Sequence, residues 1–111
     1  MEQDRQALIH QMLKTNPDDP FLIYAAALEY RKQNDKESTL NMFKKLVDEH
    51  PEYLATYYQI GKLYEEMGKL EAAISFYKKG REVAKKQNDL KTLSELSEAL
   101  MILDEDDGEV W

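Results

Sequence analysis

A self-similarity at a spacing of 34 residues constrains this 111-residue chain more than any other feature of its sequence. Moving the sequence along itself by 34 positions superposes residues of the same type or of similar size. It places Pro17 on Pro51, Ala27 on Gly61, Tyr30 on Tyr64, Asn34 on Gly68 and Phe43 on Tyr77. A regular repeat of this length indicates a unit of a few secondary-structure elements that buries its apolar face against neighbouring copies of itself.

Each repeat is predicted to form two helices joined by a short turn. In the first repeat, residues 20–50, Asp19 is a suitable N-cap, and Pro20 suits the first position of a helix. Apolar residues then recur every three or four positions, as on one buried helix face. These residues are Ile23, Ala26, Ala27 and Tyr30, followed by Leu40, Phe43, Leu46 and Val47. Asn34 suits the left-handed turn after the first helix, and Pro51 ends the second.

The second repeat, residues 53–87, follows the same plan, and the segments on either side resemble half repeats. Residues 3–15 carry the apolar stripe of a second helix, and residues 89–103 carry that of a first helix after a shift of 36 residues. The two stripes consist of Leu8, Ile9, Met12 and Leu13, and of Leu93, Leu96, Ser97 and Leu100. We therefore predict an all-α fold of about six helices in a single domain, residues 1–103. The segments 3–15 and 89–103 are its N-terminal and C-terminal capping helices.

The second repeat carries a residue pattern that resembles the tetratricopeptide repeat signature. The matching residues are Tyr57, Ile60, Gly61, Tyr64, Ala73, Tyr77 and Gly80. The first repeat keeps Tyr30, Phe43 and Pro51 of this pattern, so the resemblance covers roughly residues 17–103. It implies antiparallel helix hairpins stacked as a short right-handed superhelix, an α-solenoid. The first helices of such a superhelix line a concave groove that takes an extended peptide or a helix of a partner protein.

Charge and composition exclude several classes of partner. The chain has 15 Lys and Arg residues against 22 Asp and Glu residues, a net charge of −7, and five of these acids lie in residues 104–111. A chain without a basic stripe is a poor ligand for nucleic acid or an anionic membrane. No stretch approaches the roughly 20 apolar residues of a membrane-spanning helix. The absence of cysteine fits a reducing compartment, so we expect a cytoplasmic protein. Residues 104–111 are expected to form an acidic, flexible tail.

No convergent set of acid, base or nucleophile groups, such as catalysis needs, is visible in this sequence. Of the only two histidines, His10 falls in a predicted helix and His50 at the turn before Pro51, and the four glycines do not form a phosphate-binding loop. An EF-hand starting at Asp104 would need a glycine at position 109, which is Glu109. We therefore expect no enzyme activity, no cofactor and no metal site.

Apolar and charged residues beside the buried stripes of the first helices are the candidate binding residues. Helical spacing and the resemblance assign seven residues to the groove: Phe21, Tyr24, Leu28, Arg31, Tyr58, Lys62 and Glu65. The four apolar or aromatic members are not required by the packing pattern of the repeat, and aromatic anchors with a charged rim are typical of binding surfaces. The predicted function is therefore a protein–protein interaction module whose partner is a peptide or helix of another protein.

A self-associating scaffold protein is the alternative interpretation. Two full repeats make a short array, so a second copy could cover Phe21 and Tyr24 or pack on a terminal helix. In a variant of this alternative, the acidic tail or Trp111 occupies the chain's own groove.

Overall fold

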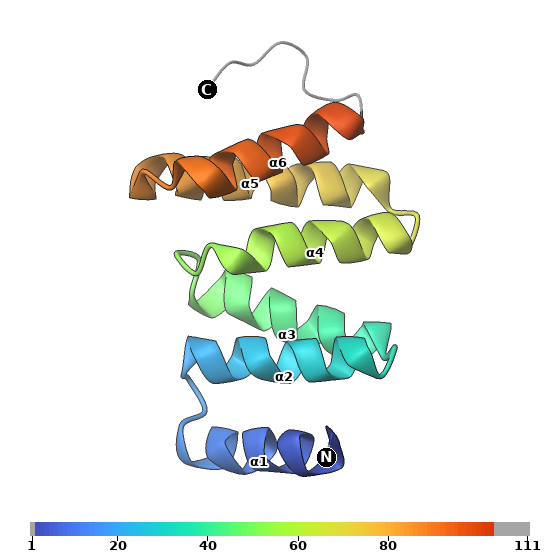
Figure 1. Ribbon diagram of the computed structural model, residues 1–111, viewed down its shortest axis with the longest axis vertical. Helices are drawn as coiled ribbons and strands as arrows, with labels where there is room; N and C mark the ends of the chain where they lie inside the picture. Colours follow the sequence, from blue (N-terminus) through green and yellow to red (C-terminus); the bar gives the residue numbers. More distant parts are fainter. Residues whose placement is uncertain (1, 104–111) are drawn as a thin grey trace. The chain divides into compact units, whose positions relative to one another are not determined.

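The computed structural model describes the backbone of residues 2–103 and the side chains of residues 5–103. This part of the chain forms six α-helices and no strand, which confirms the predicted all-α fold (Figure 1). The helices are α1 (Glu2–Thr15), α2 (Pro20–Lys32), α3 (Lys36–Glu49), α4 (Ala55–Glu66), α5 (Leu70–Gln87) and α6 (Leu90–Ile102). The chain divides into two compact units, Met1–Tyr53 and Leu54–Trp111. The predicted flexible tail, 104–111, lies outside the described residues.

Aspartates are the N-caps of α2, α3 and α6, and a residue in the left-handed conformation follows each of α2, α4 and α5. The Asp19 carboxylate accepts hydrogen bonds from the Phe21 and Leu22 amides, as predicted for the N-cap of α2. Asp35 caps α3 and Asp89 caps α6 in the same way. The positive-φ residues are Asn34 at 64°, Gly68 at 75° and Asn88 at 57°. Asn and Gly adopt this conformation at lower cost than other residues, so they fix where the chain turns back.

Loss of one of these caps should weaken the unit that contains it. We expect Asp35→Ala to lower the free energy of unfolding by about 1 kcal/mol, because the Ser38 amide loses its acceptor. Urea unfolding followed by circular dichroism measures this change. Asp48→Ala is the matched control, since Asp48 lies in the last turn of the same helix, where a negative charge is unfavourable. Equal destabilisation by both variants would contradict the capping role of Asp35.

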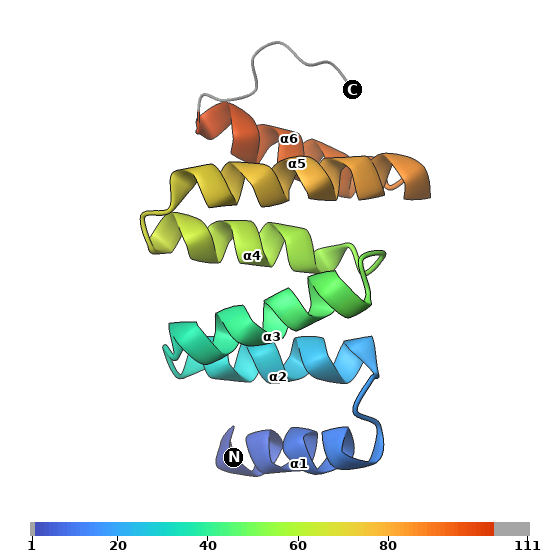
Figure 2. The ribbon, with the colours of Figure 1, turned by 180° about the vertical axis from the view of Figure 1, so that it is seen from behind.

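The first unit contains α1, α2 and α3. Helix α2 lies in front of α3 in Figure 1 and behind it in Figure 2, as expected for a packed hairpin. Helix α1 packs on this hairpin through Ile9, which joins Ala25 and Ala26 in a small core flanked by Leu13 and Met42. Polar contacts add to this packing: Arg5 Nε lies 2.8 Å from the buried Glu29 carboxylate, and His10 meets the Tyr30 ring edge-on.

The prediction of one four-residue core stripe on α1 is only partly right. Ile9 is buried and Leu13 is half-buried, but Leu8 is 56% exposed and Met12 is 42% exposed. In a complete hairpin the second helix also packs on a first helix that precedes it. No such helix is present before α1 in the described residues, so the side of α1 that carries Leu8 and Met12 faces solvent.

The second unit contains α4, α5 and α6, and glycines allow its helices to approach closely. A Cβ added at Gly61 would lie 2.2 Å from Tyr77 Cε1, and one added at Gly80 would lie 2.5 Å from Tyr57 Cβ. Each glycine thus makes room for an aromatic residue of the facing helix in the α4–α5 hairpin. Helix α6 also packs on α5, and its predicted stripe of Leu93, Leu96, Ser97 and Leu100 is buried.

Candidate protein-binding surface

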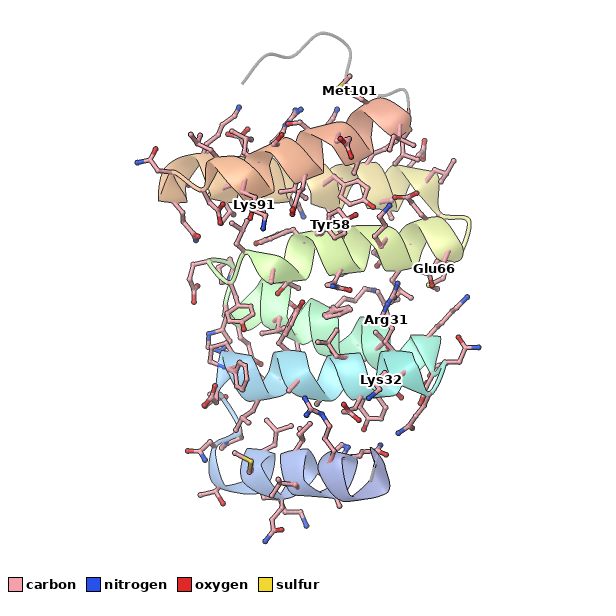
Figure 3. All side chains as sticks on the ribbon, viewed as in Figure 1. Arg31, Lys32, Tyr58, Glu66, Lys91 and Met101 are labelled. Atoms are coloured by element: carbon pink, nitrogen blue, oxygen red, sulfur yellow. The ribbon has the colours of Figure 1, made fainter. Side chains whose placement is uncertain are left out.

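In the first unit, four of the predicted site residues form one stripe along α2. Phe21, Tyr24, Leu28 and Arg31 follow one another at intervals of three or four residues, which places them on one side of the helix. The N-cap hydrogen bond from the Phe21 amide to Asp19, 2.9 Å long, fixes the start of the stripe. Phe21 is 64% exposed, whereas the other three residues are half-buried. Arg31 ends the stripe in the last turn of α2 (Figure 3).

Tyr24 contributes to the packing of the first unit as well as to its surface. Its ring centroid lies 6.1 Å from that of buried Phe43 and 5.5 Å from that of Tyr53. These contacts correct the prediction that the packing of the repeat does not require Tyr24. Tyr53 was not predicted as part of this surface because it lies in the turn after Pro51, outside any helical stripe. Burial, followed by the negative charge of Asp19, raises the pKa of Tyr53.

In the second unit, the three remaining site residues lie together on α4. The Lys62 ammonium lies 5.5 Å from the centroid of the Tyr58 ring and 3.8 Å from the Glu65 carboxylate. The cation therefore interacts with a ring on one side and an anion on the other, while all three side chains remain half-exposed. Figure 3 labels Tyr58 on α4.

Tyr77 connects this group to the core of the second unit. It is fully buried, its ring lies 6.1 Å from that of Tyr58, and its hydroxyl donates a hydrogen bond to the Glu65 carboxylate. Burial raises the pKa of Tyr77 well above its ordinary value, and the hydrogen bond and charge of Glu65 raise it further. The buried Tyr77 side chain therefore fixes the positions of Tyr58 and Glu65. Like Tyr24, Tyr58 is part of the packing, which the sequence pattern did not reveal.

The two faces can now be defined. The α2 face consists of Phe21, Tyr24, Leu28 and Arg31, and the α4 face consists of Tyr58, Lys62 and Glu65. Each face combines a partly exposed aromatic ring with at least one charged group at its edge, which suits contact with a peptide of mixed character. A surface depression at the α4–α5 turn, lined by residues 68–72, contains none of these seven residues.

The histidines and carboxylates do not gather into a reactive or metal-binding cluster in the part of the chain described. His10 packs on Tyr30, whereas His50 Nδ1 lies 3.7 Å from the Glu52 carboxylate. Within the described residues, no group of three His, Cys, Asp or Glu side chains could hold a metal ion. Among the same residues, no helix is both long enough and apolar enough to cross a membrane.

Comparison with known proteins finds similarity in both sequence and fold. Residues 24–86 match a family model described as tetratricopeptide repeat. The crystal structure of a tetratricopeptide repeat domain protein from Salinibacter ruber is 39% identical in sequence, with a TM-score of 0.74. The alignment covers 80% of this chain and 99% of that chain. A solution NMR structure of a tetratricopeptide repeat domain protein from the same organism is 38% identical. Its TM-score is 0.77, and the alignment covers 86% of this chain and 96% of that chain.

A more distant similarity concerns the fold alone. The crystal structure of MamA protein is 20% identical, with a TM-score of 0.69 over 79% of this chain and 48% of that chain. No curated protein sequence matches this chain.

Proposed function

Because this chain belongs to the tetratricopeptide repeat family, we propose that it binds a peptide or a helix of another protein through its α2 and α4 faces. Proteins built from these repeats are generally modules for protein interaction without catalytic activity. The α2 and α4 helices are the first helices of the two hairpins, and first helices line the binding groove in the family. The lack of cysteine further supports a reducing compartment, and we propose the cytoplasm.

The exposure of Phe21 is the observation on which this proposal depends most. A phenylalanine that is 64% exposed at the start of a capped helix contributes little to the core of its own unit. Its neighbours on the stripe, Tyr24 and Leu28, are half-buried, so Phe21 extends an apolar surface that is already firmly positioned. Rigid aromatic residues of this kind lose little conformational entropy on binding and often provide most of the binding energy.

The α4 face of the second unit offers a more polar contact. Lys62 is held between the Tyr58 ring and Glu65, so a ligand carboxylate could bind the ammonium without first ordering a long side chain. The aromatic ring beside it would cover an apolar ligand side chain. We therefore propose a ligand that carries an acidic group next to an apolar residue for this face.

Substitution of exposed face residues should weaken binding while leaving the fold intact. A random peptide library displayed on phage is selected against the wild-type protein, and the best peptides are titrated calorimetrically against the variants. We expect Phe21→Ala to raise about tenfold the dissociation constant of a peptide bound at the α2 face, and Lys62→Ala to do the same for a peptide bound at the α4 face, since hot-spot residues contribute roughly 1.4 kcal/mol or more.

Lys78→Ala is the matched control for Lys62→Ala, because Lys78 is exposed on α5, the second helix of the same hairpin. Its dissociation constant should equal that of the wild type. The proposal is wrong if no peptide is selected, or if every selected peptide binds both face variants as tightly as it binds the wild type.

A further inference from the structure

The two terminal helices expose large apolar side chains that their own unit does not cover. On α1 these are Leu8 and Met12, which are 56% and 42% exposed. On α6 they are Leu90, Met101 and Ile102, which are 73%, 61% and 71% exposed. Figure 3 shows Met101 on the side of α6 that points away from α5. Burying such side chains is favourable, so the positions that they occupy in the repeat are informative.

The α4–α5 hairpin defines which positions of a first and a second helix face each other. On α4, the residues that meet α5 include Tyr57, Tyr58, Gly61, Tyr64 and Glu65. The contacts from α5 come from Phe76, Tyr77 and Gly80: Tyr77 meets Tyr58, Gly61 and Glu65, Phe76 stacks on Tyr64, and Gly80 meets Tyr57.

The exposed residues of α6 occupy the positions of a first helix that face its second helix. The shift of 36 residues relates Tyr58 and Glu65 of α4 to Ser94 and Met101 of α6, which are both exposed. Ser97, the equivalent of Gly61, is already buried in its own unit. Leu90 lies four residues before Ser94, and therefore on the same side of the helix. We call Leu90, Ser94 and Met101 the free α6 face. No second helix follows α6 in the described residues to cover it.

The exposed residues of α1 occupy the complementary positions of a second helix. Two shifts of 34 residues relate Phe76 and Gly80 of α5 to Leu8 and Met12 of α1, which are both exposed. Ile9, the equivalent of Tyr77, is already buried against Ala25 and Ala26 of α2. Leu8 and Met12, which we call the free α1 face, therefore stand where a second helix packs on its first helix. In the described residues, α1 is therefore a second helix with no first helix before it, and α6 is a first helix with no second helix after it.

We propose that α6 of one copy packs against α1 of a second copy and completes a helix hairpin between the two chains. The interface would continue the hairpin register that the α4–α5 pair establishes within the unit. It does not depend on the peptide-binding function of the α2 and α4 faces.

Charge does not oppose the pairing. Helix α1 contains two acidic and two basic residues, and α6 contains Glu95 and Glu98 with Lys91, a net charge of −1.

The contact would use different surfaces on the two copies, so it is heterologous. An assembly of several copies therefore has a free α1 face at one end and a free α6 face at the other, and further copies can add there. One helix on one helix falls below the roughly 1,200 Å² of a stable interface, so we expect a dissociation constant on the order of 100 μM.

Sedimentation velocity on the full chain, followed by complementation between two variants, tests this inference. The wild-type mass should rise above 13.0 kDa as the concentration increases to about 1 mM. Leu8→Glu/Met12→Glu removes the free α1 face, and Leu90→Glu/Met101→Glu removes the free α6 face. Each variant alone should remain a monomer. An equimolar mixture should form a complex of two chains and stop there, because one intact α6 face meets one intact α1 face.

Asn41→Glu/Leu70→Glu is the control, since it adds two glutamates at exposed positions outside both free faces and outside the α2 and α4 faces. It should associate like the wild type. Because the chain has no cysteine, a milder second measurement is available. Met101→Cys mixed with Leu8→Cys should form a disulfide between the two variants faster than either variant forms one with itself. A wild type that stays at 13.0 kDa at every concentration would overturn the inference. So would a glutamate mixture that remains monomeric.

Discussion

Replacement of Gly61 by alanine is expected to lower the free energy of unfolding by about 2 to 3 kcal/mol, although alanine is the better helix former. The added methyl group would lie 2.2 Å from Tyr77 Cε1, far inside contact distance. Tyr77 has no room to retreat, because it is fully buried and its hydroxyl is hydrogen-bonded to Glu65. The α4–α5 hairpin must therefore open, and urea unfolding of the variant measures the cost.

A double-mutant cycle identifies the clash as the cause. Tyr77→Leu removes the ring, so adding Gly61→Ala to that variant should cost little, and the coupling between the two sites should be about 1 to 3 kcal/mol. Gly68→Ala serves as the control. Gly68 has a φ of 75° but no atom within 4 Å of an added Cβ, so its substitution should cost about 1 kcal/mol and be independent of Tyr77. A Gly61→Ala variant as stable as the wild type would contradict this account.

The helices could be predicted from the sequence because local residues decide where each one begins and ends. Asp19 and Pro20 start α2, Asn34 and Gly68 take the left-handed conformation, and Pro51 follows the end of α3, all as predicted. The repeat also predicts which side of α2, α4 and α6 is buried, and it predicts the buried side of α1 in part. These features depend on neighbours within a few residues of each other, so one sequence contains them in full.

The environment of the site residues could not be predicted in the same way. Spacing placed Tyr58, Lys62 and Glu65 on one side of α4, but the hydrogen bond from Tyr77 to Glu65 depends on how two helices cross and on the rotamers chosen there. The contact between Tyr24 and Tyr53 depends on the path of a turn. Leu8 and Met12 are exposed because no helix precedes α1 in the described residues, and a pattern of apolar residues does not show which of its members a neighbouring helix covers.

The hydrogen bond from Tyr77 to Glu65 should make the protein sensitive to alkali. The native state raises the pKa of Tyr77, so it retains a proton that the unfolded chain releases near pH 10. This contribution to stability is complete below pH 10 and is lost as the pH rises from 10 toward the native pKa. The unfolded state then binds fewer protons than the native state, and the loss is about 1.4 kcal/mol for each pH unit.

Comparison of the wild type with Tyr77→Phe isolates this contribution, because the other tyrosines and the lysines titrate alike in both proteins. At pH 7 the wild type should be more stable by about 1 to 2 kcal/mol, since the hydroxyl donates to a carboxylate. Above about pH 11 this difference in the free energy of unfolding should vanish and then change sign. Only the wild type must then either keep the buried Tyr77 phenol protonated or place its negative charge beside the Glu65 carboxylate. Urea unfolding at intervals between pH 7 and pH 12 gives the difference directly. A stability difference that stays constant over this range would mean that Tyr77 does not hold its proton more tightly in the folded protein.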